Sequence, residues 1–290
     1  MEEFVHFLTP YEFSPTIAGG ALLSLVLFGR GAARLREQGR SVGFWRSLAF
    51  VVGVLSMYVV MQTQYDYWSQ HMFFIHRVQH LVLHHLGPFL VALAVPIEVL
   101  GAGLPDRVAS GIQRVALSPP FAPLRWMFHQ PVLQAVVFVG LIYLWLSPEL
   151  HFYAMLNIPL YNLMNWSMAI DGLIFWLFML DPRDPRQAGT LGYGGRVLLL
   201  IAIVIPQILI GAYLGFSQES LYDVYAVCGR LWPLDPVTDQ QIGGLTTWIP
   251  ASMMSVLGLL VVIRRSAQTD RARESAAHPN AKLQASGGTA

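Results

Sequence analysis

Histidine is the residue type whose number and spacing point most directly to chemistry. Of the nine histidines in the chain, five fall within His71–His85. In a helix, His76, His80 and His84 would line one face at intervals of about 6 Å, because four residues make slightly more than one turn. Met72 extends the same stripe by one turn. Imidazoles spaced i and i+4 chelate metal ions, so this stripe predicts a metal site.

Sulfur-containing and polar side chains elsewhere could add ligands to the predicted site. Thioether sulfur favours Cu(I) and imidazole suits copper, so the combination predicts copper, as Cu(I), as the bound metal. The accessory candidates are Met57, Met61, Met164, Met168, Asp171, His71, His85 and Cys228. Each type also has a structural alternative. Histidines and carboxylates hydrogen-bond between membrane helices, methionines fill helix cores, and a buried thiol can be inert.

The composition shows what kind of scaffold must position these side chains. The chain has 290 residues, of which 54% are apolar and 12% are charged. Soluble domains carry about 25% charged residues, so half of the usual charge is missing. The formal net charge of +1 excludes a nucleic-acid binder, and the single cysteine excludes an internal disulfide framework. We therefore predict an all-α, polytopic membrane protein.

Seven apolar stretches could cross a bilayer as helices, which takes roughly 20 residues each. They predict a seven-helix bundle in which the fourth span is the shortest. The stretches are Thr16–Leu35, Phe44–Met61, Val78–Leu100, Val132–Leu146, Leu160–Leu180, Val197–Phe216 and Leu245–Ile263. We expect residues 1–265 to form one transmembrane domain. Residues 266–290, which are rich in Ala, Ser, Gly and Arg, are predicted to be a disordered tail.

Basic residues fix the predicted orientation of the bundle. With seven spans, 16 of the 18 Lys and Arg residues fall on one side, and Arg77 and Arg230 are the exceptions. The positive-inside rule makes that side cytoplasmic, so the N-terminus lies outside and the C-terminal tail lies in the cytoplasm. The histidine stripe then lies in the outer half of the membrane. Ionisable residues at this depth are costly and are expected to face the bundle interior or a water-filled cavity.

The segment Thr238–Trp248, which opens the last span, carries residues with a structural use. Asp239 and the two glutamines after it could satisfy the free N–H groups at the start of this helix. Gly243 and Gly244 would let a neighbouring helix approach closely. This segment therefore predicts a capped helix start and a tight helix contact.

Four ordered motifs resemble the CtaG family of cytochrome c oxidase assembly factors, which are multi-span proteins of the bacterial inner membrane. Together they extend over most of the chain. The motifs are His76-Arg-Val-Gln-His80-Leu-Val-Leu with Gly87-Pro88, Phe128-His129-Gln130-Pro131, Asp171-Gly-Leu-Ile-Phe-Trp176 with Leu180-Asp181-Pro182, and Asp239-Gln-Gln-Ile-Gly-Gly244 with Trp248.

The resemblance implies a role in maturing a haem–copper oxidase by handling copper for its metal centres. It implies oxidase subunits, the lipid bilayer and periplasmic copper chaperones as partners. His76 and His80 match the family's His-x-x-x-His motif. The chain departs from the family near Asn165 and Ser167, where many members carry histidines. The metal site is therefore expected to differ from theirs or to be absent.

Two other functions fit the same residues. The protein could be a structural membrane chaperone for an oxidase subunit, with histidines that only hydrogen-bond between helices. It could also be a copper or haem transporter, although two histidines at i and i+4 cannot take opposite axial positions on one haem. The sequence contains no nucleotide-binding loop, nucleophile elbow or haem attachment motif. We therefore predict no catalytic residues and no enzyme.

Overall fold

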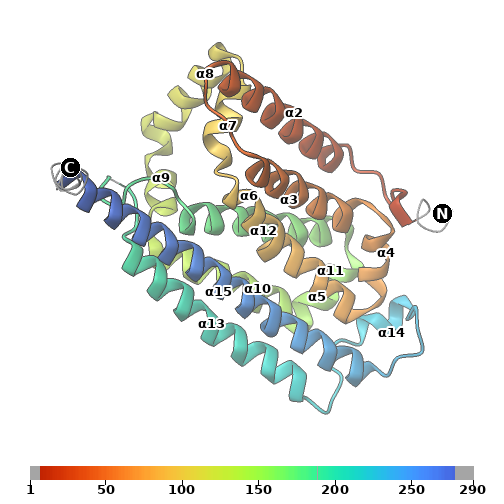
Figure 1. Ribbon diagram of the computed structural model, residues 1–290. Coiled ribbons are helices and arrows are strands. Elements are labelled where there is room, and N and C mark those ends of the chain that lie inside the picture. The colour runs from red at the N-terminus through yellow and green to blue at the C-terminus, as the bar shows by residue number, and fades with distance from the viewer. Residues whose placement is uncertain (1–6, 188, 278–290) are drawn as a thin grey trace, which may run out of the picture.

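The computed structural model describes residues 7–187 and 189–277, and this part of the chain is all-α (Figure 1). The α-helices are accompanied by one π-helical turn, η1, and one 3-10 turn, η2. In chain order the elements are α2 (Pro15–Glu37), α3 (Phe44–Gln62), α4 (Gln64–His71), α5 (Phe73–Leu81), η1 (Val82–Leu86), α6 (Gly87–Leu93), α7 (Pro96–Gly103), α8 (Asp106–Leu117), η2 (Pro119–Phe121), α9 (Ala122–Phe128), α10 (Pro131–Leu146), α11 (Pro148–Leu156), α12 (Ile158–Met179), α13 (Tyr193–Phe216), α14 (Val224–Cys228) and α15 (Pro236–Ala277).

Four of the described helices, α2, α3, α13 and α15, are long and apolar enough to cross a membrane. Two pairs of helices reach that length together. They are α5 to α6 with α7, bent by 71°, and α10 with α11, bent by 74°. The described chain therefore has four candidate spans, or up to six if each bent pair is one span. α12 is long enough but less apolar, because it carries Asn162, Asn165 and Asp171. The count of seven spans and the orientation of the termini stay predictions.

The third predicted span, Val78–Leu100, is not one continuous helix. α6 ends at Leu93, Val95 adopts the left-handed φ of 51°, and α7 begins at Pro96. Proline lacks the N–H that would continue the hydrogen-bond ladder, and its ring disfavours a helical conformation in the residue before it. Pro96 therefore divides the predicted span, and the histidines lie on the part before the bend.

α15 packs along α13 over much of its length (Figure 1). Gly244 lies against the backbone of α13, where a Cβ atom would come within 2.5 Å of Gly215 N. Only glycine fits this approach, as expected from the sequence. Gly243 packs on α5 instead, where a Cβ would lie 2.3 Å from the Phe73 ring. These two glycines therefore hold α15 against α13 on one side and α5 on the other.

The end of α15 differs from the predicted tail. The helix continues through Ala277, beyond residue 265 where we placed the start of disorder. Arg273 forms an ion pair with Asp184 at 3.0 Å, and Thr269 donates a hydrogen bond to Arg265 O. Polar side chains in the part of α15 beyond residue 265 therefore have partners. Residues 278–290 of the predicted tail lie outside the described residues.

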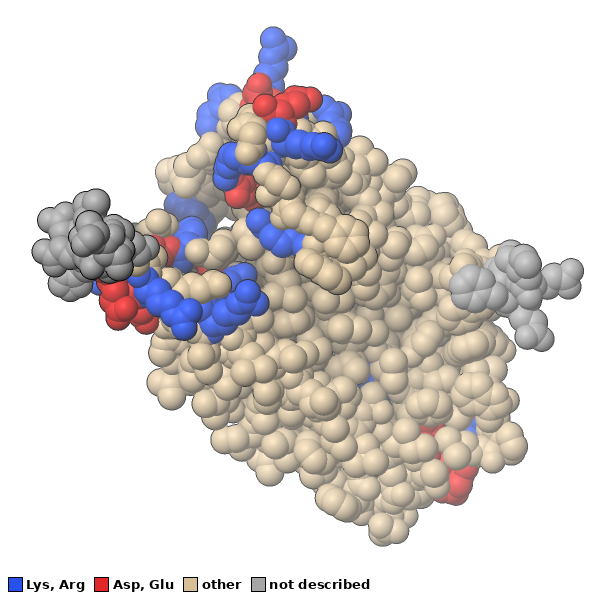
Figure 2. All heavy atoms as spheres, in the orientation of Figure 1, with Lys and Arg blue, Asp and Glu red and all other residues tan. Residues whose placement is uncertain are grey.

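Basic side chains gather at one end of the molecule, which we call the basic end, whereas the broad surface in the middle of the view carries almost no charged side chains (Figure 2). Arginines at the basic end bind the C-terminal carbonyls of helices. Arg34 donates to Ala102 O over 2.9 Å, and Arg196 donates to Asp181 O over 2.6 Å. Helix C-termini carry free carbonyls and partial negative charge, so cations are favourable there.

The opposite end of the bundle contains α4, α14 and the start of α5, and we call it the α4–α14 end (Figure 1). The buried Asp239 carboxylate accepts hydrogen bonds from the N–H groups of Phe73 and Phe74, over 3.0 and 2.9 Å, and pairs with Arg230. Asp239 therefore caps α5 and not its own helix, which corrects our expectation. This cap fixes the start of α5, the helix that carries the histidine stripe.

Candidate functional site

The histidine stripe lies on α5 and η1, and it faces the interior of the bundle. His76, His80 and His84 are buried, with at most 4% of each residue exposed. α12 covers the stripe at close range. Gly172 of α12 lies against the His84 carbonyl, where a Cβ atom would sit 2.5 Å from that oxygen. This glycine lets the polar side chains of α12 reach the histidines.

The turn η1 interrupts the regular α-helix at the inner end of the stripe. A π turn bonds residue i to residue i+5 and so contains one more residue than an α turn. His84 and His85, which are adjacent in sequence, are both buried here, at 0% and 3% exposure. π turns are frequent at functional sites. In a regular α-helix, His85 would point about 100° away from His84.

Five side chains form a continuous series of hydrogen bonds, which we call the histidine chain. Arg77 Nη2 lies 3.4 Å from His80 Nδ1, and His80 Nε2 lies 3.0 Å from His76 Nε2. His76 Nδ1 lies 2.8 Å from the Tyr225 hydroxyl, which lies 2.9 Å from His151 Nε2. The histidine chain thus joins α5 to α14 and α11.

The two ends of the histidine chain fix the position of every proton in it when the rings are neutral. A carbonyl only accepts, so His151 Nδ1 donates to Trp145 O over 3.0 Å, and His151 Nε2 accepts from Tyr225. Burial raises the pKa of Tyr225 well above its ordinary value, which keeps that hydroxyl proton in place. The hydroxyl oxygen accepts from His76 Nδ1, and His76 Nε2 accepts from His80 Nε2. His80 Nδ1 then accepts from the arginine, which can only donate.

Polar residues of α4 and α12 enclose the histidine chain. Asn165 Oδ1 lies 3.2 Å from His80 Nε2 and accepts a second hydrogen bond from the N–H group that His80 Nε2 donates to His76. Asp66 Oδ1 accepts from the Tyr161 hydroxyl over 2.7 Å and from Gln79 Nε2 over 2.8 Å. Burial raises the pKa of Asp66 to about 6 although these hydrogen bonds act to lower it. Every one of these polar groups therefore has a partner within the protein.

A second group of residues, which we call the π-turn cluster, consists of His84, His85, Met168 and Asp171. His84 Nε2 donates to Asp171 Oδ2 over 2.9 Å, so Nδ1 of the neutral ring carries a lone pair. His84 Nδ1 and both ring nitrogens of His85 are buried without a hydrogen-bond partner among the described residues. Buried polar atoms are almost always paired, and unpaired ones commonly indicate an absent water or ion.

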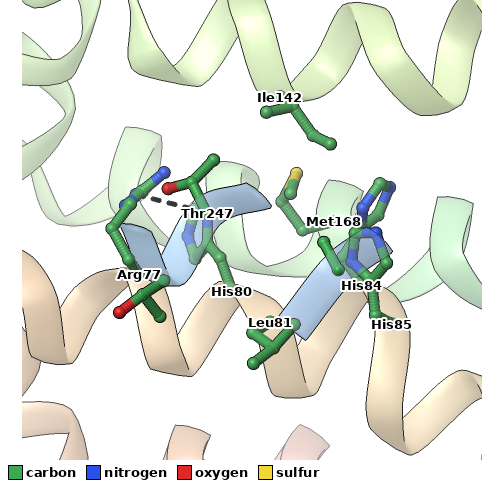
Figure 3. A pocket seen from close by; sticks show the side chains of 10 residues that line it. Arg77, His80, Leu81, His84, His85, Ile142, Met168 and Thr247 are labelled. Atoms are coloured by element: carbon green, nitrogen blue, oxygen red, sulfur yellow. Dashed lines mark hydrogen bonds between the residues drawn. The ribbon is translucent and has the colours of Figure 1, made fainter. Parts of the chain in front are cut away.

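A small cavity connects the two groups. Figure 3 shows His84, His85 and Met168 on one side of it and Arg77 and His80 on the other. The cavity measures about 20 Å³. About 10–15 Å³ suffices for one water molecule, so this space suits a single water or a single ion. The structure therefore places a cavity for one water molecule or one ion beside His84, His85 and Met168.

The predicted trio His76, His80 and His84 does not converge on one point. His76 and His80 face each other, whereas His84 turns to Asp171. Within residues 7–187 and 189–277, no group of three or more His, Cys, Asp or Glu side chains is arranged to hold a metal ion. Copper binding at this trio stays a prediction.

The accessory candidates are distributed over several parts of the fold. Met168 and His85 line the cavity of the π-turn cluster, and Asp171 binds His84 beside it. Met57 and Met61 line an apolar groove that α3 and α12 border. Met164 is buried in the core, as is Met72 of the predicted stripe. His71 and Cys228 lie at the α4–α14 end.

Sequence reasoning missed several residues that complete the site. Arg77 entered only as an exception to the positive-inside rule, yet a lone arginine in an apolar segment already indicates a buried polar partner. Asn165 entered only as a departure from the family pattern. Tyr225 lies on the five-residue helix α14, which is too short for a periodic pattern to signal burial. Gln207 of α13 is buried beside His85, and no motif marks it.

Comparison with known protein families matches residues 26–269 to the family described as cytochrome c oxidase caa3 assembly factor (Caa3_CtaG). This chain belongs to that family. The match confirms the resemblance carried by the four sequence motifs. It begins within α2 and ends within α15, so the part of the chain shared with the caa3 assembly factor family includes the histidine chain and the π-turn cluster.

Curated relatives of this caa3 assembly factor family member are mycobacterial proteins described as uncharacterized. Those of Mycobacterium bovis and Mycobacterium tuberculosis are each 24% identical over 91% of this chain, and one of Mycobacterium leprae is 23% identical over 92%. The chain spans about 40% of the length of these relatives. No solved structure matches the chain.

Proposed function

We propose that this protein assists the assembly of a haem–copper cytochrome c oxidase in the bacterial plasma membrane by carrying Cu(I) as cargo and handing it to the oxidase. The family supports the role in oxidase assembly. The observation that supports copper is the gathering of imidazoles with a thioether in one buried interior. The side chains are His76, His80, His84, His85, His151 and Met168. Imidazole and thioether are the ligands that suit Cu(I).

His76 and His80 are the pair that faces each other most directly, with 3.0 Å between their Nε2 atoms. In the ion-free chain these two atoms share the proton of His80. Cu(I) bound to both would take the place of that proton, and His80 would then carry its proton on Nδ1. Because Nδ1 faces the Arg77 guanidinium, binding at this pair requires the arginine to withdraw.

The α4–α14 end is the natural place for exchange of the cargo, because the pair lies nearer to this end than the π-turn cluster does. We propose that this end faces the periplasm, where copper chaperones would deliver the ion and an oxidase subunit would receive it. The location of most basic residues at the opposite end supports this orientation.

Metal analysis of the protein purified in detergent and loaded with Cu(I) tests the copper proposal. We expect wild type to bind copper and the His76→Ala/His80→Ala variant to bind less. His129→Ala is a matched control, since this histidine lies at the basic end, and it should bind as wild type does. Absence of copper from loaded wild type would refute the proposal that copper is the cargo.

A structural chaperone is the second candidate, and the histidine chain favours it because every imidazole nitrogen in it is paired. The histidine chain joins α5, α11 and α14 by hydrogen bonds alone, without a bound ion. Oxidase activity in a strain carrying the His76→Ala/His80→Ala variant separates the two functions. Recovery on addition of copper to the medium supports copper delivery, whereas a copper-independent defect in a stably folded variant supports the structural role.

A further inference from the structure

The two histidine groups differ in how completely their nitrogens are used. Each ring nitrogen of His76, His80 and His151 has a partner. In the π-turn cluster, His84 Nδ1 and both nitrogens of His85 form no hydrogen bond among the described residues, although the buried Gln207 amide lies beside His85. A lone pair left without a partner in a buried, apolar place is costly, so its presence calls for a bound partner.

We propose that the π-turn cluster is a separate Cu(I) site, with His84 Nδ1, a ring nitrogen of His85 and the Met168 thioether as ligands. The proposal rests on the proposed function and places the resting position of the cargo deeper in the bundle than the His76–His80 pair. Two imidazoles and one thioether are soft, neutral ligands of the kind that select Cu(I).

The hydrogen bond of His84 to Asp171 prepares this histidine as a ligand. Metal-binding histidines usually donate their second N–H to a carboxylate, which fixes the tautomer and orients the ring. His84 Nε2 donates to Asp171 Oδ2 over 2.9 Å, and both residues are buried. This hydrogen bond therefore leaves the Nδ1 lone pair free to bind an ion before the ion arrives. Asp171 acts as a positioning residue and supplies a negative charge close to the ion.

The π-turn cluster also needs less rearrangement than the His76–His80 pair. An ion bound to His80 Nε2 must displace the proton shared with His76 and Asn165, and it must reverse the tautomer held by Arg77. An ion at His84 Nδ1 displaces no hydrogen bond among the described residues. The cavity of about 20 Å³ that His84, His85 and Met168 line already provides space for one ion.

Arg77 lines the same cavity and sets the charge that the site accepts. No carboxylate among the described residues forms an ion pair with its guanidinium, and its Nε is unpaired. Asp239 of α15, the acid that caps the start of α5, is already bound by Arg230 and two backbone N–H groups. The repulsion from this cation disfavours a divalent ion more than a monovalent one. Removing the charge should therefore tighten Cu(I) binding.

Conservative variants test the site without removing side-chain volume from the core. Met168→Leu keeps the side-chain volume and removes the sulfur, and Met164→Leu, on the same helix but away from the cavity, is its matched control. Cu(I) affinity is measured in detergent by competition with a coloured Cu(I) chelator. X-ray absorption at the copper edge detects a sulfur neighbour independently of affinity.

We expect Met168→Leu to weaken binding and remove the sulfur signal, and Met164→Leu to change neither. Asp171→Asn should weaken binding by about 10- to 100-fold, and Arg77→Gln should strengthen it. The His76→Ala/His80→Ala variant should still hold one Cu(I) with a sulfur neighbour.

Two results would overturn the proposal while leaving the proposed function in place. One is an unchanged copper spectrum and affinity in Met168→Leu. The other is complete loss of copper in a folded His76→Ala/His80→Ala variant, which would place the ion at that pair. Wild type that binds no Cu(I), with only water in the cavity, would overturn both proposals together.

Discussion

Replacing Asp66 with asparagine should change the pH dependence of stability more than the stability itself. Asp66 Oδ1 accepts hydrogen bonds from Tyr161 and Gln79, and an asparagine oxygen can accept both. Asp66 Oδ2 accepts from Gln70 Nε2 over 3.1 Å. The half-buried Gln70 amide can turn over to present its oxygen to the new amide group. The variant therefore removes a titrating proton and keeps the hydrogen bonds.

The size of the effect follows from the pKa of Asp66, which burial raises from 3.8 to about 6. A difference of about two pKa units corresponds to about 3 kcal/mol. The native protein holds this proton more tightly than the unfolded chain does, so the unfolded chain binds fewer protons between pH 3.8 and 6. Stability from this group therefore falls as pH rises through that window and is constant above it.

Equilibrium unfolding in detergent, followed by tryptophan fluorescence, measures the effect between pH 4 and pH 8. Other groups titrate in this range, so the informative quantity is the free energy of unfolding of wild type minus that of Asp66→Asn. We expect this difference to fall by about 2 kcal/mol between pH 4 and pH 6.5, because part of the full effect is lost below pH 4, and then to stay level. A difference that is independent of pH, or that rises with pH, would refute the burial argument for Asp66.

Two further substitutions test how tightly the site is packed and paired. Gly172→Ala should lower stability by about 1–3 kcal/mol, since its Cβ would meet a backbone carbonyl of η1 at 2.5 Å. Gly140→Ala, which faces open space on α10, should be neutral or stabilising, and equal melting temperatures for the two variants would contradict this packing argument. Tyr225→Phe should cost about 2 kcal/mol because it leaves nitrogens of His76 and His151 unpaired. An unchanged melting temperature would count against the histidine chain.

The sequence predicted the all-α class and the inward face of the histidine stripe, because both follow from composition and helical periodicity. Each predicted apolar stretch lies on helices of the structure. The bend at Pro96 follows from the local effect of proline and was predictable from that residue. The boundary after residue 265 stays a prediction, although α15 continues past it as a polar helix whose partners, such as Asp184, lie in a distant loop.

The composition of the site was harder to predict than its location. Spacing along one helix identified His76, His80 and His84 but carries no information about which neighbouring helix each ring meets. The division of the stripe depends on α12, where Asp171 draws His84 away from the other two. It also depends on the π turn, which a regular helical projection does not contain. Tertiary packing therefore determined the ligand grouping.

The hydrogen bonds from Arg77 to Trp145 all point the same way, from a group that only gives protons to a group that only receives them. No single ring along this path can reverse without setting two N–H groups, or two lone pairs, against each other. The series therefore has one direction, from α5 through the Tyr225 hydroxyl to the carbonyl at the end of α10, and its fixed ends hold each ring in a single tautomer. The buried imidazoles and the short helix α14 are in this way joined by hydrogen bonds that share one orientation.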